Sequence, residues 1–357
     1  MTKRIGILTF HYADNYGAVL QAYALRKVIC SFSGCRADII NYVPKHYNYP
    51  IYYENSKMMD LQKKKWEKFQ KFLSEYCGIC TPMVRSVTGN EYDVYLVGSD
   101  QVWNTDISIA AADYEYLLPH LDAEAKRVAY SASVGMEFER INTDLFKRYL
   151  PKFKKISVRE KSYTKIISEL SGKPCECTLD PTLLLDEADY MDLVEKPDTL
   201  EEPFLLYFCY GTEDRGLAGI ETVNALSRKY NLLVKHTFSS ETSLTKKLIV
   251  RDGGNVMQSG IGEFLWYIKN AKIIITNSFH GAAFSILFKK PFYMYLNIRS
   301  CRQENLVEIL QLEDRIVRGY IPSNKLNLTI DYESVFNILE KERAHSISYL
   351  KDAIGVV

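Results

Sequence analysis

The sequence lacks the patterns that identify several large classes of protein. Its first apolar run stops at His11, too early for a signal peptide, and no run approaches the roughly 20 residues of a membrane helix. The 45 Lys and Arg balance 44 Asp and Glu, whereas a nucleic-acid binder needs a basic surplus. There is no internal repeat and no low-complexity tract. We therefore expect a cytoplasmic globular protein with no nucleic-acid partner.

Several catalytic and metal motifs are also missing. There is no G-x-x-x-x-G-K-[ST], no G-x-G-x-x-G after the first strand-like run and no G-x-S-x-G elbow. Cys77 and Cys80 form C-x-x-C, and Cys175 and Cys177 form C-x-C, which could together bind zinc. The two pairs lie far apart in the chain, so we expect free thiols and no metal.

What the sequence does contain is an alternation of short β-branched or aromatic runs with amphipathic helical stretches. This pattern predicts an α/β protein whose parallel sheets are covered by helices. The acidic stretch Asp186–Pro203 is typical of a linker, so we expect two Rossmann-like domains, residues 1–190 and 200–330, facing across a cleft. A final helix, Tyr332–Ala353, could return to the first domain. The 26 Tyr, 16 Phe and 3 Trp favour a carbohydrate ligand.

The strongest candidate site follows the buried run Lys272–Thr276. The run leads directly into Asn277 and Ser278, which are good helix N-cap residues, and then into Phe279-His280-Gly281. A helix N-terminus binds anions, and a His in its first turn could donate a proton once an anion is bound. The alternative is a His that only forms hydrogen bonds within a tight turn.

A second candidate is Arg159, which follows a strand and opens a helix. Its guanidinium could hold a carboxylate or a phosphate in a bidentate manner, or it could form a salt bridge with Glu160 or another neighbour. Arg299 and Arg302, in the loop after Phe292–Leu296, form a third basic group.

The strand-end loops of the first half are rich in hydroxyls, amides and aromatics and poor in cations. Such a surface suits a neutral, polyhydroxylated ligand. Helix capping would explain Asn15 and Ser131 equally well. The candidate ligand-binding residues of these loops are His11, Asn15, Tyr16, Ser99, Asp100, Trp103, Ser131 and Ser133.

Several motifs follow one another along the chain: Gly6-Ile-Leu-Thr-Phe-His11, Asn15-Tyr-Gly-Ala-Val-Leu-Gln21, Val97-Gly-Ser-Asp-Gln-Val-Trp-Asn104, Tyr130-Ser-Ala-Ser-Val-Gly135, Ser157-Val-Arg-Glu160, Leu179-Asp-Pro-Thr-Leu-Leu184 and Thr276-Asn-Ser-Phe-His-Gly281. In this order they resemble the polysaccharide pyruvyl transferase family, from about residue 4 to about residue 310. The resemblance implies a two-domain fold like that of the GT-B glycosyltransferases and transfer of pyruvate from phosphoenolpyruvate onto a sugar as a cyclic ketal.

The resemblance implies that phosphoenolpyruvate is a co-substrate and that no cofactor is needed. His280 would protonate its methylene carbon, and Arg159 would act beside it. In some relatives an Arg precedes the family's His by two residues, where this chain has Ser278. The implied donor-binding residues are Arg159, Asn277, Ser278, Phe279, His280, Gly281, Arg299 and Arg302.

The acceptor would be a sugar, either lipid-linked or part of an oligosaccharide, in capsular or surface polysaccharide synthesis. The basic amphipathic stretch Lys63–Leu73 could rest on the inner membrane face, or its apolar side could be core and its lysines solvated. Two other functions stay open. One is a nucleotide-sugar glycosyltransferase, with Glu263 on the ribose; the other is a non-catalytic sugar-binding relative, against which the presence of both Arg159 and His280 argues.

Overall fold

The computed structural model describes two compact units. The first unit comprises Met1–Ile51, Gln70–Leu185 and Leu339–Val357, and the second comprises Tyr52–Phe69 and Asp186–Ile338. The residues that the structure describes are 2–44, 56–78, 82–89, 91–104, 114–135, 140–198, 202–209, 219–237, 249–296, 301–319, 322 and 325–356.

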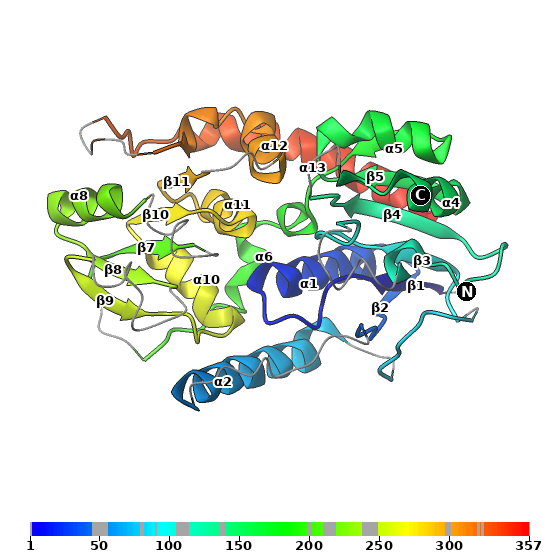
Figure 1. The fold of residues 1–357 in the computed structure, drawn as a ribbon, viewed down its shortest axis with the longest axis horizontal. Helices are drawn as coiled ribbons and strands as arrows, with labels where there is room; N and C mark the ends of the chain where they lie inside the picture. The colour runs from blue at the N-terminus through cyan, green and yellow to red at the C-terminus, as the bar shows by residue number, and fades with distance from the viewer. Residues whose placement is uncertain are drawn as a thin grey trace. The chain divides into compact units, whose positions relative to one another are not determined.

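The first unit is built on a parallel sheet of six strands in the order β2-β1-β3-β4-β5-β6 (Figure 1). Its strand order reverses between β1 and β3. The strands are β1 Lys3–Leu8, β2 Cys35–Ile39, β3 Val94–Val97, β4 Arg127–Ala132, β5 Phe153–Val158 and β6 Cys175–Cys177. The α-helices that lie wholly in this unit are α1 Tyr16–Ser31, α4 Thr143–Tyr149 and α5 Thr164–Ser171, and the short helices are η1 Leu73–Cys77, η2 Glu115–Leu117, η4 Leu150–Lys152, η5 Lys161–Tyr163 and η6 Pro181–Leu184.

The second unit has its own parallel sheet, in the order β12-β11-β10-β7-β8-β9. Counted within this unit, this is the Rossmann order 3-2-1-4-5-6 read from its other end, and it reverses between β7 and β10. The strands are β7 Phe204–Phe208, β8 Leu233–His236, β9 Asp252–Asn255, β10 Ile273–Thr276, β11 Phe292–Tyr295 and β12 Ile316–Val317. The helices are α6 Glu187–Met191, α8 Ile220–Tyr230, α10 Ile261–Asn270, α11 Phe279–Leu287, α12 Cys301–Ile309 and η7 Glu313–Arg315.

The strands at the middle of each sheet are buried along their whole length. Every residue of β3, β4, β7, β10 and β11 is buried. A parallel sheet that helices cover on both faces requires continuous apolar strands rather than alternating ones, and Ile273-Ile-Ile-Thr276 is an example. The predicted α/β fold class is therefore confirmed in both units.

Two helices are divided between the units. Helix α2 (Ser56–Phe72) belongs to the second unit up to Phe69, and helix α13 (Tyr332–Ile354) belongs to the first unit from Leu339 onward. In its later part Ser346 Oγ accepts a hydrogen bond from Leu179 N (2.9 Å), and Tyr349 Oη donates to Ala129 O (3.0 Å). The expected return of the last helix to the first unit is confirmed by these bonds. Within the part of the chain that the structure describes, no helix is both long and apolar enough to cross a bilayer.

Candidate functional site

In the second unit, the sequence folds into a tight strand-to-helix turn at the point where the strand order reverses. Thr276 Oγ1, at the end of β10, donates to Phe208 O at the end of β7 (2.6 Å) and accepts from Ser278 N (3.0 Å). Ser278 is the N-cap of α11, and its Oγ accepts from Gly281 N (3.3 Å). The predicted capping role of Ser278 is confirmed. In open α/β sheets this strand edge is the place where ligands bind.

His280 lies in the first turn of α11 and is 7% exposed. Its ring meets the ring of Phe279 edge to face, with 5.1 Å between centroids. The next residue must be glycine, because a Cβ at Gly281 would lie 2.4 Å from Thr276 Oγ1 and 2.9 Å from Phe208 Cδ1. Helix α11 is thus pressed against the sheet, and the imidazole is held at the positive end of its helix dipole.

Helix α12 adds further polar groups to this edge. Gln303 Nε2 donates to Asn277 O (3.1 Å), which ties α12 to the turn after β10, and Arg302 is half-buried in the same first turn of α12. Arg318, after β12, pairs with Glu304 and donates to Leu296 O (3.2 Å). Arg299, the other predicted cation, lies outside the described residues. This edge therefore combines a helix N-terminus, an imidazole and a guanidinium.

In the first unit, the predicted acceptor loops meet where its strand order reverses. Thr9 Oγ1, after β1, donates to Ser99 O after β3 (2.8 Å), and Gln21 Nε2 donates to Thr9 Oγ1 (2.8 Å). His11 is 1% exposed and forms hydrogen bonds with Thr9 O (3.2 Å) and Asn41 Oδ1 (3.1 Å). Burial lowers the pKa of His11, although these hydrogen bonds oppose the shift. The ring is therefore part of the scaffold of this edge.

A buried group of charged side chains lies beside this point. Arg159 Nη1 binds Asp180 Oδ2 at 2.5 Å, and Arg159 Nη2 lies 3.9 Å from Asp100 Oδ1. Ser99 Oγ donates to Asp180 Oδ2 (3.0 Å), while the backbone N–H and the hydroxyl of Thr182 donate to the other oxygen of Asp180 (3.0 and 2.7 Å). Each oxygen of the Asp180 carboxylate thus has two donors.

Glu160 completes this group, which we call the first-unit charge network: Asp100, Arg159, Glu160 and Asp180. Ser133 Oγ and Val134 N both donate to the Glu160 carboxylate. Burial lowers the pKa of Arg159, but the carboxylates of Asp180, Glu160 and Asp100 outweigh burial and raise it. Three carboxylates and one guanidinium give the network an excess of negative charge, which suits a ligand that donates hydrogen bonds from hydroxyl groups.

Asp100 is the member of this network that is best placed to meet a ligand. Its side chain is 10% exposed, against 0% for Asp180 and 2% for Arg159. It has φ 72°, a left-handed conformation that Asp tolerates better than most residues, and its Oδ1 accepts from Gln101 N (2.8 Å). The strained turn directs one carboxylate toward the strand edge.

Two sequence predictions need correction. Arg159 is 2% exposed, so its guanidinium is not available for bidentate binding of an anion. The salt-bridge alternative describes it better, and the partner is Asp180 rather than Glu160. Trp103 is 1% exposed, its Nε1 donates to Tyr116 O (3.1 Å), and its ring packs against Phe146 and Phe153. Trp103 is therefore a core residue, with no ring face for a sugar.

The remaining predicted acceptor residues have mostly structural contacts. Asn15 caps α1 by accepting from Gly17 N and Ala18 N, and Tyr16, 2% exposed, begins that helix. Ser131 Oγ donates to Thr178 O (3.1 Å), so it is held by a neighbouring loop rather than by helix capping. Glu160, Asp180 and Thr182 were not among the predicted binding residues, although all three lie in the motifs quoted above. The signal for Asp180 was Asp-Pro-Thr directly after a strand-like run, a helix N-cap pattern.

No group of His, Cys, Asp and Glu among the described residues could hold a metal ion. Cys77, Cys175 and Cys177 are free thiols, and Cys80 lies outside the described residues.

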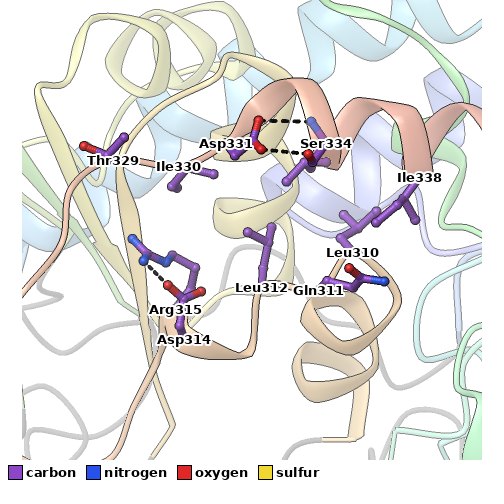
Figure 2. Close-up of a pocket in the computed structure, with 11 residues that line it drawn as sticks. Leu310, Gln311, Leu312, Asp314, Arg315, Thr329, Ile330, Asp331, Ser334 and Ile338 are labelled. Atoms are coloured by element: carbon purple, nitrogen blue, oxygen red, sulfur yellow. Dashed lines mark hydrogen bonds and ion pairs between the residues drawn. The ribbon is translucent and has the colours of Figure 1, made fainter.

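The second unit also contains a cavity of about 250 Å³ between η7 and the start of α13, shown in Figure 2. Its charged groups neutralise one another locally: Arg315 pairs with Asp314 and donates to Asn327 O (2.6 Å), and Asp331 accepts from Ser334 N and Oγ. The cavity lies at the amino end of β12, whereas His280 follows the carboxyl end of β10. We assign it no role.

Comparison with solved structures shows which fold this is. UDP-N-acetylglucosamine 2-epimerase from Rickettsia bellii superposes with a TM-score of 0.50 at 9% identity, and the match covers 98% of each chain. The enzyme from Neisseria meningitidis, bound to UDP-GlcNAc, gives a TM-score of 0.49 at 11% identity, covering 98% of this chain and 94% of the other. Two Rossmann-like units that match the Rickettsia bellii structure over nearly the whole chain are GT-B-like, as predicted.

Among curated proteins, none matches the sequence significantly. The sequence profile of the polysaccharide pyruvyl transferase family matches residues 15–298, a range that contains Asp100, Arg159, Asp180 and His280. The chain belongs to the polysaccharide pyruvyl transferase family.

Proposed function

We propose that this transferase moves pyruvate from phosphoenolpyruvate onto two hydroxyls of a sugar as a cyclic ketal. The observation that carries the proposal is the position of His280: in the first turn of α11, directly after β10, where the strand order of the second unit reverses. In this proposal the second unit binds the donor and the first unit binds the acceptor.

The second-unit edge suits phosphoenolpyruvate because that molecule carries a phosphate and a carboxylate on one small carbon frame. The N-terminal turn of α11, from Asn277 to Gly281, would hold one anionic group. Arg302, half-buried in the first turn of α12, would balance the other. Ser278 occupies the position of an Arg in some relatives, and its role as N-cap leaves a cation to be supplied by Arg302 or by Arg299.

The chemistry needs one acid and an acceptor site. His280 donates a proton to the methylene carbon, which becomes a methyl group, and positive charge develops at the central carbon. One sugar hydroxyl attacks that carbon and releases its proton. The bond to the phosphate oxygen then breaks, inorganic phosphate leaves, and the second hydroxyl closes the ketal with loss of its own proton. No electron is transferred to or from a cofactor in these steps.

The first-unit edge supplies what the acceptor needs. Asp100, the most exposed carboxylate of the first-unit charge network, would accept hydrogen bonds from sugar hydroxyls. Arg159 would act as a positioning residue, since it holds Asp180 directly and lies 3.9 Å from Asp100. We propose a lipid-linked or oligosaccharide acceptor in capsular or surface polysaccharide synthesis, modified in the cytoplasm.

The contacts of Glu263 weaken the glycosyltransferase alternative. Its Oε2 accepts from Gly260 N (2.6 Å) in the capping box of α10 and binds Lys68 Nζ (2.6 Å). A carboxylate engaged in this way is not available to hold a ribose.

The test compares ligands and one histidine variant. Phosphoenolpyruvate should raise the melting temperature of the protein, and UDP-N-acetylglucosamine should not. His280→Gln should lower kcat by about 10²- to 10⁴-fold and change the KM for phosphoenolpyruvate much less. His345→Gln is the matched control, because His345 is largely exposed on α13. The reaction in D₂O should place deuterium in the ketal methyl group.

Each outcome separates the candidate functions. Stabilisation by the UDP-sugar alone would replace this proposal with the glycosyltransferase, and stabilisation by a sugar without any turnover would favour the non-catalytic relative. A His280→Gln variant with near-normal kcat would remove His280 as the acid.

A further inference from the structure

Positive charge is concentrated in one short part of the chain. Between Thr143 and Lys173 there are nine Lys or Arg and three Asp or Glu, although the whole chain has a net charge of only +1. Arg159 and Glu160 carry opposite charges and are both buried in the first-unit charge network, so they add no charge to the surface. The rest of the segment therefore carries an unbalanced basic surface.

The structure gathers five of these cations on neighbouring elements of the first unit. Helices α4 and α5 both pack against η4, and Lys173 Nζ donates to Pro151 O within η4. Burial lowers the pKa of Lys173, and the nearby charge of Lys154 lowers it further. We call this set the cationic patch; its members are Lys147, Arg148, Lys152, Lys154 and Lys173.

The patch lacks counter-charges. Among the described residues, no carboxylate lies within 4.0 Å of the charged atoms of any of its five members. The two exposed acids of the segment are Asp144, in the first turn of α4, and Glu169 in α5. Lysines that stand close together with no carboxylate partner repel one another, so the patch is suited to an external anionic surface.

The position of the patch separates it from the candidate active site. Lys152 and Lys154 flank Phe153, the first residue of β5, and Lys173 lies two residues before β6. These are amino ends of strands, whereas Asp100, Arg159 and Asp180 follow carboxyl ends. The patch can therefore bind a partner without covering the carboxyl ends of these strands, where the acceptor would bind.

The composition of the patch indicates which anion it fits. Four of its five cations are lysines, which act as point charges, whereas recognition of a single phosphate more often uses the arginine fork. Arg148 and Lys152 lie over the ring of Tyr149, at 5.4 and 5.0 Å from its centroid, so this ring is not an open platform for a nucleic-acid base. Clusters of four to eight basic residues of this kind bind anionic lipid surfaces.

We propose that the cationic patch docks the first unit onto a bilayer surface that carries anionic lipid headgroups. This surface differs from the one suggested by the sequence. In α2, Phe69 and Phe72 are buried in the protein, Lys68 pairs with Glu263, and Lys63 and Lys64 are exposed near Asp60 and Glu67. The proposal rests on charge placement alone, and it would bring a lipid-linked acceptor to this unit if the proposed function holds.

The test is sedimentation with vesicles of phosphatidylcholine, with or without phosphatidylglycerol. The full chain should bind only the anionic vesicles, and more weakly as salt increases. The variant with Lys147→Gln, Arg148→Gln, Lys152→Gln and Lys154→Gln should bind more than about a hundredfold more weakly, since each cation contributes about fivefold. The control removes the same charge elsewhere, by Lys63→Gln, Lys64→Gln, Lys71→Gln and Lys341→Gln, and should bind within about threefold of the unchanged chain.

Three results would overturn the proposal: equal loss in the control variant, equal binding to uncharged vesicles, or tighter binding of a single-stranded RNA that the patch variant loses. Circular dichroism checks that both variants fold. Stabilisation by phosphoenolpyruvate is measured on the same samples, so failure of the docking proposal and failure of the proposed function are distinguishable.

Discussion

The two strand edges of this protein carry different polar chemistry on the same kind of sheet. In the first unit, one guanidinium and three carboxylates are buried and bonded to one another and to hydroxyls. In the second unit, the turn after β10 places an imidazole in the first turn of α11, with neutral N-cap residues around it. A helix N-terminus attracts anions, whereas an excess of carboxylates repels them.

Under the proposed function, this difference gives each of the two substrates a separate unit. A donor with two negative groups and an acceptor with only hydroxyls require opposite surroundings. Placing them on separate sheets lets each edge keep its own charge balance. The stability of the first-unit edge should therefore depend on its charges, and that of the second-unit edge on its packing.

The largest expected effect tests this dependence in the first unit. Arg159→Met should lower the free energy of unfolding by about 3–5 kcal/mol, because it leaves buried carboxylates without their cation. Arg318→Met removes an exposed partner of Glu304 in the second unit and should cost about 1 kcal/mol or less. Urea unfolding followed by circular dichroism measures both. Similar losses in the free energy of unfolding for the two variants would mean that the buried network stabilises the fold no more than a surface ion pair does.

The second prediction separates binding from stability at Asp100. Asp100→Asn keeps an oxygen for Gln101 N and suits the left-handed backbone, so the unfolding midpoint should move much less than in Arg159→Met, which removes the central cation of the network. Loss of the charge should raise the KM for the acceptor about 10- to 100-fold and leave the KM for phosphoenolpyruvate nearly unchanged. Asp144→Asn, an exposed change on α4, is the control. Equal changes in both KM values would place Asp100 outside the acceptor site.

The smallest effect concerns pH. Because burial depresses the pKa of His11, the unfolded chain binds a proton more readily than the folded one below about pH 6.5. The stability that this neutral ring contributes is complete above that pH and is lost as pH falls toward the folded pKa. The free energy of unfolding should therefore decrease less steeply between about pH 7 and 5.5 in His11→Gln than in the unchanged chain. An equal slope in His11→Gln and in the unchanged chain would contradict this prediction.

Much of the fold could be predicted from the sequence because apolar runs mark buried parallel strands. The predicted buried run Lys272–Thr276 contains β10, and the final helix begins at Tyr332 as predicted. Strand β9, Asp252-Gly-Gly-Asn255, was missed because an edge strand needs no apolar side chains; it exists through its pairing with β8. Helix α11 begins at Phe279 because Ser278 caps it, so His280 lies in its first turn as expected.

The candidate site was less predictable because its contacts depend on strand register. Arg159 and Asp180 are 21 residues apart and meet only because β5 and β6 are neighbours. A sequence pattern shows that each follows a strand, but not that one neutralises the other. For Trp103, the residue type fits a sugar platform and a core position equally well, and only the surrounding Phe146 and Phe153 decide between them.

The return of α13 to the first unit sets an order in time for synthesis on the ribosome. Arg343 donates to Leu183 O and Leu185 O, and Ser346 accepts from Leu179 N, a residue made 167 positions earlier. At about 5–20 residues per second, the first unit waits roughly 8–33 s for these partners. The second unit, whose segments all precede Leu339, can finish folding before then. The part of the chain that is made first is therefore completed last, and it is the part that a chaperone would need to protect.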